Sequence, residues 1–238
     1  MARVLVLFAH PALEKSRVNR ALVAVVPALR RRLPGLTFHD LYEAYPDFGV
    51  DVAHEQALLV AHDVVVLHHP FYWYSTPPLV KQWEDLVLEH GWAYGSQGRM
   101  LEGKRLLNVV TVGGGAAAYG PEGYNRFTVR QLLAPIEQTA RLCRMTYLPP
   151  WVVHGTHRLS DAEVSDTAGR YAALLTRLHD DRVDEGSTDA EEQEANAFAA
   201  ELLTGVPPRR FRAADRWPIA EELAAEADSS GGGSDLDL

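Results

Sequence analysis

The chain has 238 residues, 47% hydrophobic and 23% charged, which suits one ordinary globular domain with a substantial core. Its net charge of −9 arises in residues 183–238, which hold 14 acidic and 4 basic residues, so the rest is near neutral and lacks the basic stripe that nucleic acid would require. A single cysteine, Cys143, excludes an internal disulfide and fits the cytoplasm, and no apolar run reaches the length of a membrane span.

In chain order, five short segments rich in Val and Leu alternate with amphipathic segments, which predicts buried parallel strands joined by crossover helices. Strands are expected at 4–9, 36–40, 64–68, 106–111 and 148–153, and helices at 19–33, 52–62, 77 to about 90, about 126–141 and about 161–180. This alternation predicts an α/β, doubly wound domain whose binding crevice lies beyond the carboxyl ends of the strands. The loops after the first, third and fourth strands are therefore the expected ligand site.

Residues 183–238 break this pattern. They are acidic and polar, and 229–234 read SSGGGS, the composition of a flexible linker. We expect one domain at 1–182 and an acidic, mobile C-terminal tail at 183–238. Two short helical patches, near 192–203 and 219–227, leave open a docking role for the tail.

The loop after the first strand reads AHPALEKSRVNRAL, with His10 at the strand end and Ser16 and Asn19 around the start of a helix. Helix N-terminal amides favour an anion, and hydroxyl and amide side chains add hydrogen bonds, so this loop predicts a phosphate site. The alternative is that Ser16 serves only as the N-cap of the helix.

The loops after the third and fourth strands favour a flat ligand. HHPFYWYSTPPL has four aromatic residues in succession at 71–74, which suit the face and edge of an aromatic ring system. Packing in the core is the alternative, and it is favoured for Phe71 and Trp83. VTVGGGAAAYGPEGY has three glycines at 113–115, whose backbone can approach a ligand closely and offer it unshielded amides.

Four other patterns fall short of a function. The glycines of VTVGGGAAA fit a loose dinucleotide-binding pattern, but Gly120 and Pro121 interrupt the helix that should follow. GRMLEGKR at 98–105 resembles a P-loop, yet Arg105 stands where Ser or Thr is needed and a strand follows instead of preceding. The histidines lack the helical spacing of a metal site, so no metal is expected, and no G-x-S-x-G elbow supports a serine hydrolase.

Taken together, AHP with SRVN, YPDF, HHPFYWYSTPPLVKQWEDLV, HGWAYG and TVGGG resemble the flavodoxin-like NAD(P)H dehydrogenase (quinone) family, and within it the ancillary oxidoreductases of glutathione-regulated potassium-efflux systems. The resemblance runs from about residue 3 to residue 182. It implies a flavodoxin-like doubly wound five-stranded parallel sheet with helices on both faces. It also implies a cytoplasmic homodimer that binds FMN, or alternatively FAD, and reduces quinones with NAD(P)H.

Our hypothesis for such an enzyme is a ping-pong cycle, in which hydride passes from NAD(P)H to flavin N5 and two electrons then pass to a quinone or similar acceptor. Tyr119 matches the tyrosine found over the flavin in related quinone reductases and is the candidate catalytic residue. Val112 stands where relatives often have Thr, and the histidine partner of that tyrosine is missing, its place falling near Tyr124 and Asn125. The positions matching the family's flavin contacts are His10, Ser16, Arg17, Val18, Asn19, Phe71, Tyr72, Trp73, Tyr74, Val112, Gly113, Gly114 and Gly115.

Two other functions stay open at this point. The first is a flavin-binding regulatory subunit of a potassium-efflux antiporter with incidental reductase activity, which would sit peripherally on the inner face of the cell membrane. The second is a one-electron carrier, which is disfavoured because carriers dock through strongly acidic faces and the body of this chain is near neutral. The sequence does not decide between NADH and NADPH.

Overall fold

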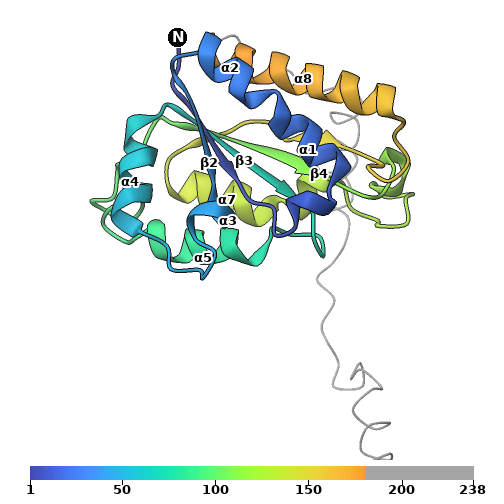
Figure 1. Cartoon of the computed structure of the whole chain (residues 1–238). Coiled ribbons are helices and arrows are strands. Elements are labelled where there is room, and N and C mark those ends of the chain that lie inside the picture. The colour runs from blue at the N-terminus through green and yellow to red at the C-terminus, as the bar shows by residue number, and fades with distance from the viewer. Residues whose placement is uncertain (181–238) are drawn as a thin grey trace, which may run out of the picture. The chain divides into compact units, whose positions relative to one another are not determined.

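The computed structural model describes residues 1–180, which form a parallel sheet between two layers of helices (Figure 1). The order across the sheet is β2-β1-β3-β4, and both β5 and β6 pair with β4 beyond it. The strands are β1 (Val4–Phe8), β2 (Leu36–Asp40), β3 (Val64–Pro70), β4 (Arg105–Thr111), β5 (Thr146–Tyr147) and β6 (Trp151–Val153). The expected doubly wound α/β fold is confirmed. The predicted tail at 183–238, with its helical patches and the boundary at 182, lies outside the described residues.

Helices cover both faces of the sheet (Figure 1). On one face lie α1 (Arg17–Ala24), α2 (Val26–Arg32) and α8 (Asp161–His179). On the other lie α3 (Leu41–Ala44), α4 (Val52–Ala61), α5 (Pro78–Val87) and α7 (Ala134–Leu142). The remaining helical segments are η1 (Leu13–Lys15), η2 (Ala116–Ala118) and α6 (Val129–Leu132). No helix within residues 1–180 is long and apolar enough to span a bilayer.

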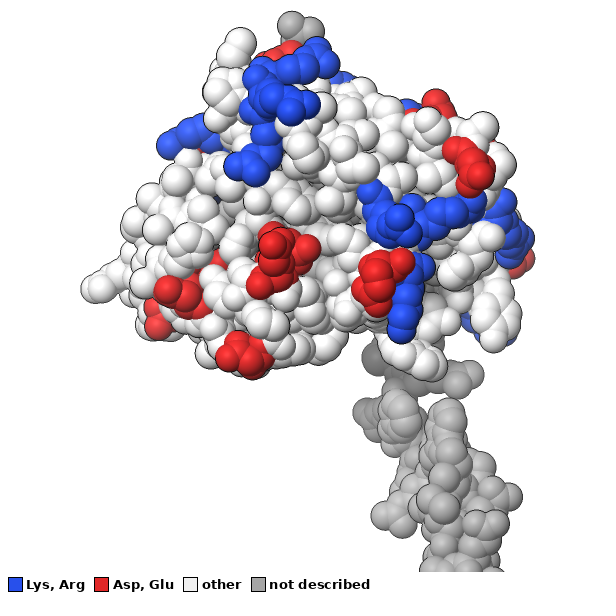
Figure 2. Space-filling view, in the orientation of Figure 1, with Lys and Arg blue, Asp and Glu red and all other residues white. Residues whose placement is uncertain are grey.

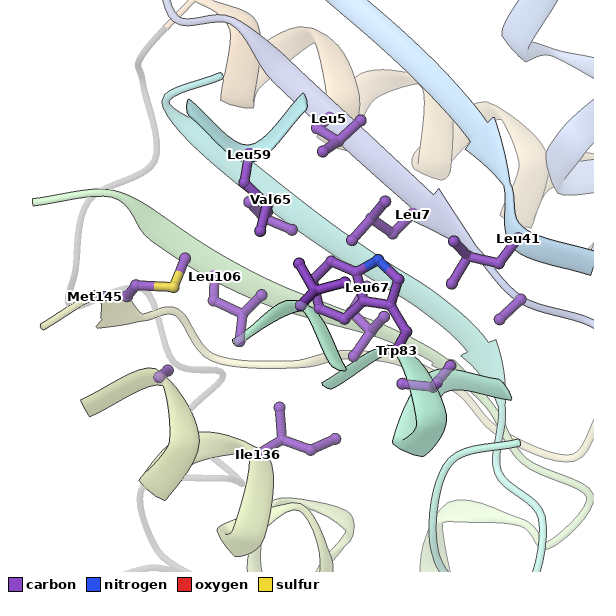
Figure 3. Packing of buried hydrophobic residues seen from close by; sticks show 14 of the residues in the cluster. Leu5, Leu7, Leu41, Leu59, Val65, Leu67, Trp83, Leu106, Ile136 and Met145 are labelled. Carbon is purple, nitrogen blue, oxygen red and sulfur yellow. The ribbon is translucent and has the colours of Figure 1, made fainter. Parts of the chain in front are cut away.

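Alternation of side chains along the strands divides the interior into two cores. Leu5 and Leu7 of β1 belong to the core with residues of α4, α5 and α7, whereas Phe8 belongs to the core with residues of α1, α2 and α8. Figure 3 shows the first core, where Trp83 of α5 packs among leucines of β1 and β3. The core role expected for Trp83 is confirmed, since only 5% of that residue is exposed.

Two of the predicted helices are each broken in two, and a proline explains each break. The expected helix at 19–33 is α1 followed by α2, with the junction at Val25, because Pro27 has no N–H to continue the hydrogen-bond ladder. The expected helix at 126–141 is α6 followed by α7, because Pro135 interrupts it in the same way. The single-helix predictions were wrong there, although the segments are helical.

The predicted fifth strand at 148–153 was wrong in its bounds. Strand β6 covers only the second half of that range, because Pro149 and Pro150 lack the N–H that sheet pairing needs, and the two-residue strand β5 lies before the range. The sequence analysis also missed the one-turn helix α3, whose N-cap Asp40 accepts hydrogen bonds from two backbone amides of the first turn. These differences leave the carboxyl ends of β1, β3, β4 and β6 side by side at one edge of the sheet.

Candidate functional site

A cavity of about 670 Å³ opens where β1, β3, β4 and β6 end. Its size lies in the range of sites for small molecules and cofactors. Its walls come from four loops, because the segment after β6 joins the three loops that the sequence singled out. The lining residues are His10, Ala12, Lys15, Ser16, Arg17, Val18, Pro70, Phe71, Tyr72, Thr111, Gly113, Thr156, His157 and Leu159.

The predicted site residues separate into three groups. Seven line this cavity: His10, Ser16, Arg17, Val18, Phe71, Tyr72 and Gly113. Four line an adjoining cavity of about 350 Å³, which shares Phe71 with the first: Trp73, Tyr74, Gly114 and Tyr119. Asn19 and Val112 are buried, and Gly115 lines neither cavity. The loop between β1 and α1 and the loops after β3 and β4 are thus brought together as expected.

Ser16 begins α1 and also lines the main cavity, so the N-cap role and a ligand role are compatible. Its Oγ accepts hydrogen bonds from the backbone amide of Asn19 at 3.3 Å and from Asn19 Nδ2 at 3.0 Å. Helix geometry leaves the first-turn amides of α1 without intrahelical partners, and their dipoles favour an anion. Arg17 is fixed in the wall, because its guanidinium pairs with Asp161 at 2.7 Å and donates to the Leu159 carbonyl.

A buried chain of hydrogen bonds lies beneath this end of the cavity. Tyr171 Oη lies 3.0 Å from His68 Nδ1, and His68 Nε2 lies 3.0 Å from Asn19 Oδ1. Asn19 Nδ2 donates to Ser16 Oγ and also to Thr111 Oγ1, the latter at 2.9 Å. Both His68 and Tyr171 are fully buried. We call this set of five residues the buried relay.

The acceptor Asn19 Oδ1 fixes the direction of the relay. An amide oxygen can only accept, so His68 Nε2 carries the proton and its Nδ1 accepts from Tyr171. Burial lowers the pKa of His68 to about 3, so the ring is neutral at physiological pH. Because Asn19 donates to both hydroxyl oxygens, Ser16 and Thr111 are left with their own protons to donate into the cavity.

His10 adds a further donor to the lining of the cavity. Its Nδ1 accepts from the Ala12 amide at 3.1 Å, and burial lowers the pKa of the ring, which is therefore neutral with its proton on Nε2. The ring makes an edge contact with Tyr72 at a centroid distance of 6.1 Å. One end of the cavity is therefore rich in donors, the chemistry that a phosphate requires.

The aromatic run after β3 forms a tight turn. The backbones of Tyr72 and Ser75 exchange two hydrogen bonds, of 3.1 and 3.0 Å, and Trp73 and Tyr74 between them have φ values of 49° and 62°. Left-handed backbone is unfavourable for such residues and occurs where the surroundings impose it. The turn leaves Trp73 93% exposed beside the second cavity, while Tyr74 Oη donates to Asn125 Oδ1 at 3.1 Å.

The glycines after β4 permit close packing against two side chains from other loops. A Cβ on Gly113 would stand 3.1 Å from the His157 ring, and a Cβ on Gly114 would stand 3.0 Å from Tyr119 Cε2. Val112 lies below the cavity, with its amide donating to Val153 O and its carbonyl accepting from Thr156 N. Its side chain and both backbone groups are therefore engaged within the protein.

A histidine that the sequence analysis overlooked lies beside Tyr119. The ring of His154, from the end of β6, is 5.6 Å from the Tyr119 ring, and its Nδ1 is buried without a hydrogen-bond partner. Burial lowers the pKa of His154 and raises the pKa of Tyr119, so both are neutral at physiological pH. Tyr124 and Asn125, where the sequence placed the gap left by a partner histidine, line the second cavity as well.

Comparison with known proteins gives a consistent result. Residues 2–175 match a family described as having a flavodoxin-like fold. The glutathione-regulated potassium-efflux system ancillary protein KefG of Cronobacter sakazakii is 45% identical over 174 residues, which are 73% of this chain and 92% of KefG. The crystal structure of general stress protein 14 from Treponema denticola in complex with FMN is 39% identical, with a TM-score of 0.69, over 74% of this chain and 99% of that one. The NADPH-quinone reductase of P. pentosaceus is 31% identical, with a TM-score of 0.63, over 74% and 97%.

Proposed function

The chain belongs to the flavodoxin-like fold family, and we propose that it is an FMN-dependent NAD(P)H:quinone oxidoreductase. The relative from Treponema denticola binds FMN, and the relative from P. pentosaceus is a quinone reductase. The observation that carries the proposal is the buried relay, which leaves two hydroxyl donors and a helix N-terminus facing a cavity large enough for a mononucleotide.

The residues present fit FMN. A phosphate needs several donors, which Ser16, Thr111 and the first turn of α1 provide at one end of the cavity. A flat ring system needs aromatic surface and unshielded amides, which Phe71, Tyr72 and the backbone of Gly113 and Gly114 provide in the walls of the two adjoining cavities. When bound, FMN supplies the redox chemistry, by accepting a hydride and passing on two electrons.

Each wall then has a distinct task. Ser16 and Thr111 donate hydrogen bonds to the phosphate and anchor it. Phe71 and Tyr72 would hold the plane of the ring, and the amides of Gly113 and Gly114 would stabilise negative charge on its edge. The phenol of Tyr119, whose pKa burial raises, keeps its proton and donates a hydrogen bond to the carbonyl oxygen of a quinone.

We assign the second cavity to the nicotinamide and the quinone in turn. It adjoins the main cavity at Phe71, and aromatic rings from two loops line it. Trp73 and Tyr124 are more than nine-tenths exposed there, and Phe127 nearby in sequence is 54% exposed. Exposed aromatic rings at the mouth of a site support the proposal that a second copy of the chain covers it in a homodimer.

The reductase is favoured over a one-electron carrier by the distribution of charge. On the face shown in Figure 2, Asp and Glu lie in small groups, one of them directly beside Lys and Arg, and they form no broad acidic patch. A carrier docks its partners through a broad acidic face, which steers association. Residues 1–182 are near neutral, which suits a small-molecule acceptor better.

The test is the visible spectrum of the purified full chain, recorded without oxygen before and after NADH or NADPH and then after a quinone. We expect a flavin spectrum that bleaches with the nicotinamide and returns with the quinone, and mass analysis of the released cofactor that identifies FMN. Steady-state rates that give parallel lines in double-reciprocal plots support the ping-pong order. A colourless protein that neither FMN nor FAD can reconstitute contradicts the proposal.

A second candidate function rests on the 45% identity to KefG, an ancillary protein of a potassium-efflux system. In this alternative the chain is a flavin-binding subunit that associates with such an antiporter on the cytoplasmic face of the membrane, and turnover is incidental. Co-purification with an antiporter from the native host, together with negligible turnover of the isolated chain, supports this alternative. Robust turnover of the isolated chain supports the enzyme.

A further inference from the structure

We propose that His39, His54 and Glu55 form a binding site for one transition-metal cation of the Zn²⁺ type, at the edge of the sheet between β2 and α4. Each residue offers one donor atom, and the three atoms lie within 4.8 Å of one another. None of the three lines the main cavity or the second one. The site is therefore separate from the proposed flavin site.

The three residues come from neighbouring elements that converge at this edge. His39 is one residue before the end of β2, and His54 and Glu55 lie in the first turn of α4. His39 Nε2 is 2.7 Å from Glu55 Oε1, and the His39 and His54 rings are 5.7 Å apart at an angle of 61°. The packing of α4 beside β2 thus brings together metal-ligating atoms whose proximity the spacing in the sequence does not predict.

The buried carboxylate forms the floor of the site. Glu55 is fully buried, and its carboxylate contacts His39, Tyr45 and Trp83. Tyr45 Oη donates to Oε1 at 2.5 Å and Trp83 Nε1 donates to Oε2 at 2.8 Å, which fixes the carboxylate. Orientation of a ligand by such hydrogen bonds is the usual arrangement around bound metals.

The groups that contact this carboxylate are an imidazole, a phenol and an indole. Glu55 is fully buried, and within residues 1–180 its ion-pair partner is His39 rather than a lysine or arginine. A buried carboxylate is costly unless a positive charge or a metal balances it. A divalent cation between Glu55 and the two imidazoles would supply that charge.

The donor set selects the class of cation. Two imidazoles and one carboxylate suit Zn²⁺ and its neighbours, whereas Mg²⁺ and Ca²⁺ prefer oxygen ligands alone. Ligands on a tetrahedral Zn²⁺ lie about 2.0–2.2 Å from the metal and hence roughly 3.3 Å apart. On binding, the His39–Glu55 pair would open from 2.7 Å and release the proton that it shares, and the exposed side chain of His54 would rotate toward the metal, which leaves a fourth position for water.

The experiment is equilibrium dialysis of the full chain, prepared without a histidine tag and stripped with EDTA, against Zn²⁺ and separately against Mg²⁺. We expect one equivalent of Zn²⁺, no comparable uptake of Mg²⁺, and a melting temperature that rises with Zn²⁺ and returns with EDTA. His54→Ala should weaken Zn²⁺ binding by about tenfold or more, because removal of a ligand costs more metal affinity than removal of a residue that hydrogen-bonds a ligand.

His90→Ala is the matched control, because His90 is also exposed and lies outside the cluster. Every histidine and the one cysteine of the chain fall within residues 1–180. Because His90→Ala keeps every carboxylate, it also accounts for weak binding to scattered carboxylates. Co²⁺ as a spectroscopic substitute should give ligand-field bands that His54→Ala removes and His90→Ala retains. Zn²⁺ uptake equal in all three proteins, or no uptake by the parent chain, overturns the proposal.

Discussion

Replacement of Tyr171 by Phe should destabilise the protein through the buried relay rather than through packing. The ring of Tyr171 is fully buried and remains in Tyr171→Phe, so no large cavity forms. What disappears is the hydroxyl that donates to His68 Nδ1 over 3.0 Å. Because His68 is fully buried, its nitrogen cannot find water as a replacement partner.

The size of the effect follows from that unpaired nitrogen. A buried polar group that loses its partner costs about 1–3 kcal/mol, so the free energy of unfolding should fall by about 2 kcal/mol. In a domain of this size, each kcal/mol shifts the melting temperature by roughly 2–4 °C. We therefore expect a decrease of roughly 4–8 °C, without loss of the fold.

Urea denaturation of the apoprotein followed by circular dichroism measures this change, and Tyr42→Phe provides the control. The oxygen of Tyr42 is also buried but has no hydrogen-bond partner of ordinary geometry, although the Leu79 backbone approaches it. Its removal should leave stability unchanged or slightly raised. If Tyr171→Phe and Tyr42→Phe have equal effects, the relay does not exist as described.

Three further predictions concern the relay and the glycine loop. Ser16→Ala and Thr111→Ala should each weaken FMN binding by about 10- to 100-fold, because each removes one charge-assisted hydrogen bond. Neither should change the affinity for riboflavin, which has no phosphate, and fluorescence titrations measure both affinities. Burial lowers the pKa of His68 to about 3, so as pH falls the histidine becomes protonated in the unfolded chain before it does in the folded protein. The free energy of unfolding should therefore decrease as pH falls below about 6.5. Urea titrations at several pH values should show a smaller decrease for His68→Asn than for the parent chain. Gly114→Ala should displace Tyr119 and lower kcat with a quinone by about 10- to 100-fold, whereas the helix-surface control Gly169→Ala, where a Cβ meets open space, should retain kcat.

The layered fold could be predicted because apolar periodicity reports it directly. The first four strands were each placed to within two residues, and the second helix and the last one were placed to within a residue or two. The errors cluster at prolines inside otherwise continuous patterns, such as Pro27 and Pro135, where the loss of one N–H outweighs local periodicity. The helix α3 was missed because a single turn is too short to show a period.

The candidate site was predictable only in part. The loops after β1, β3 and β4 carry conspicuous residues, and they do meet. The sequence placed His68 at the end of the third strand without a role, because that role depends on Tyr171, which lies 103 residues away. Thr156 and His157 could have been found by applying the same strand-end argument to β6.

The metal-ligating candidates show a different limit of sequence reasoning. His39 precedes His54 by 15 residues and lies on a strand, so no spacing rule for a single helix detects the pair. The convergence depends on how α4 packs beside β2, which is tertiary information. Spacing motifs detect sites built on one element, whereas this group spans two.

The measurement that tests the central claim most directly is turnover of the purified full chain with NADH or NADPH and a quinone, before and after removal of the bound cofactor. We predict that activity disappears in the apoprotein, returns with one equivalent of FMN, and returns far less with riboflavin at the same concentration. Turnover that persists without cofactor, or that riboflavin restores as well as FMN, would contradict the assignment of the donor-rich cavity to the flavin phosphate.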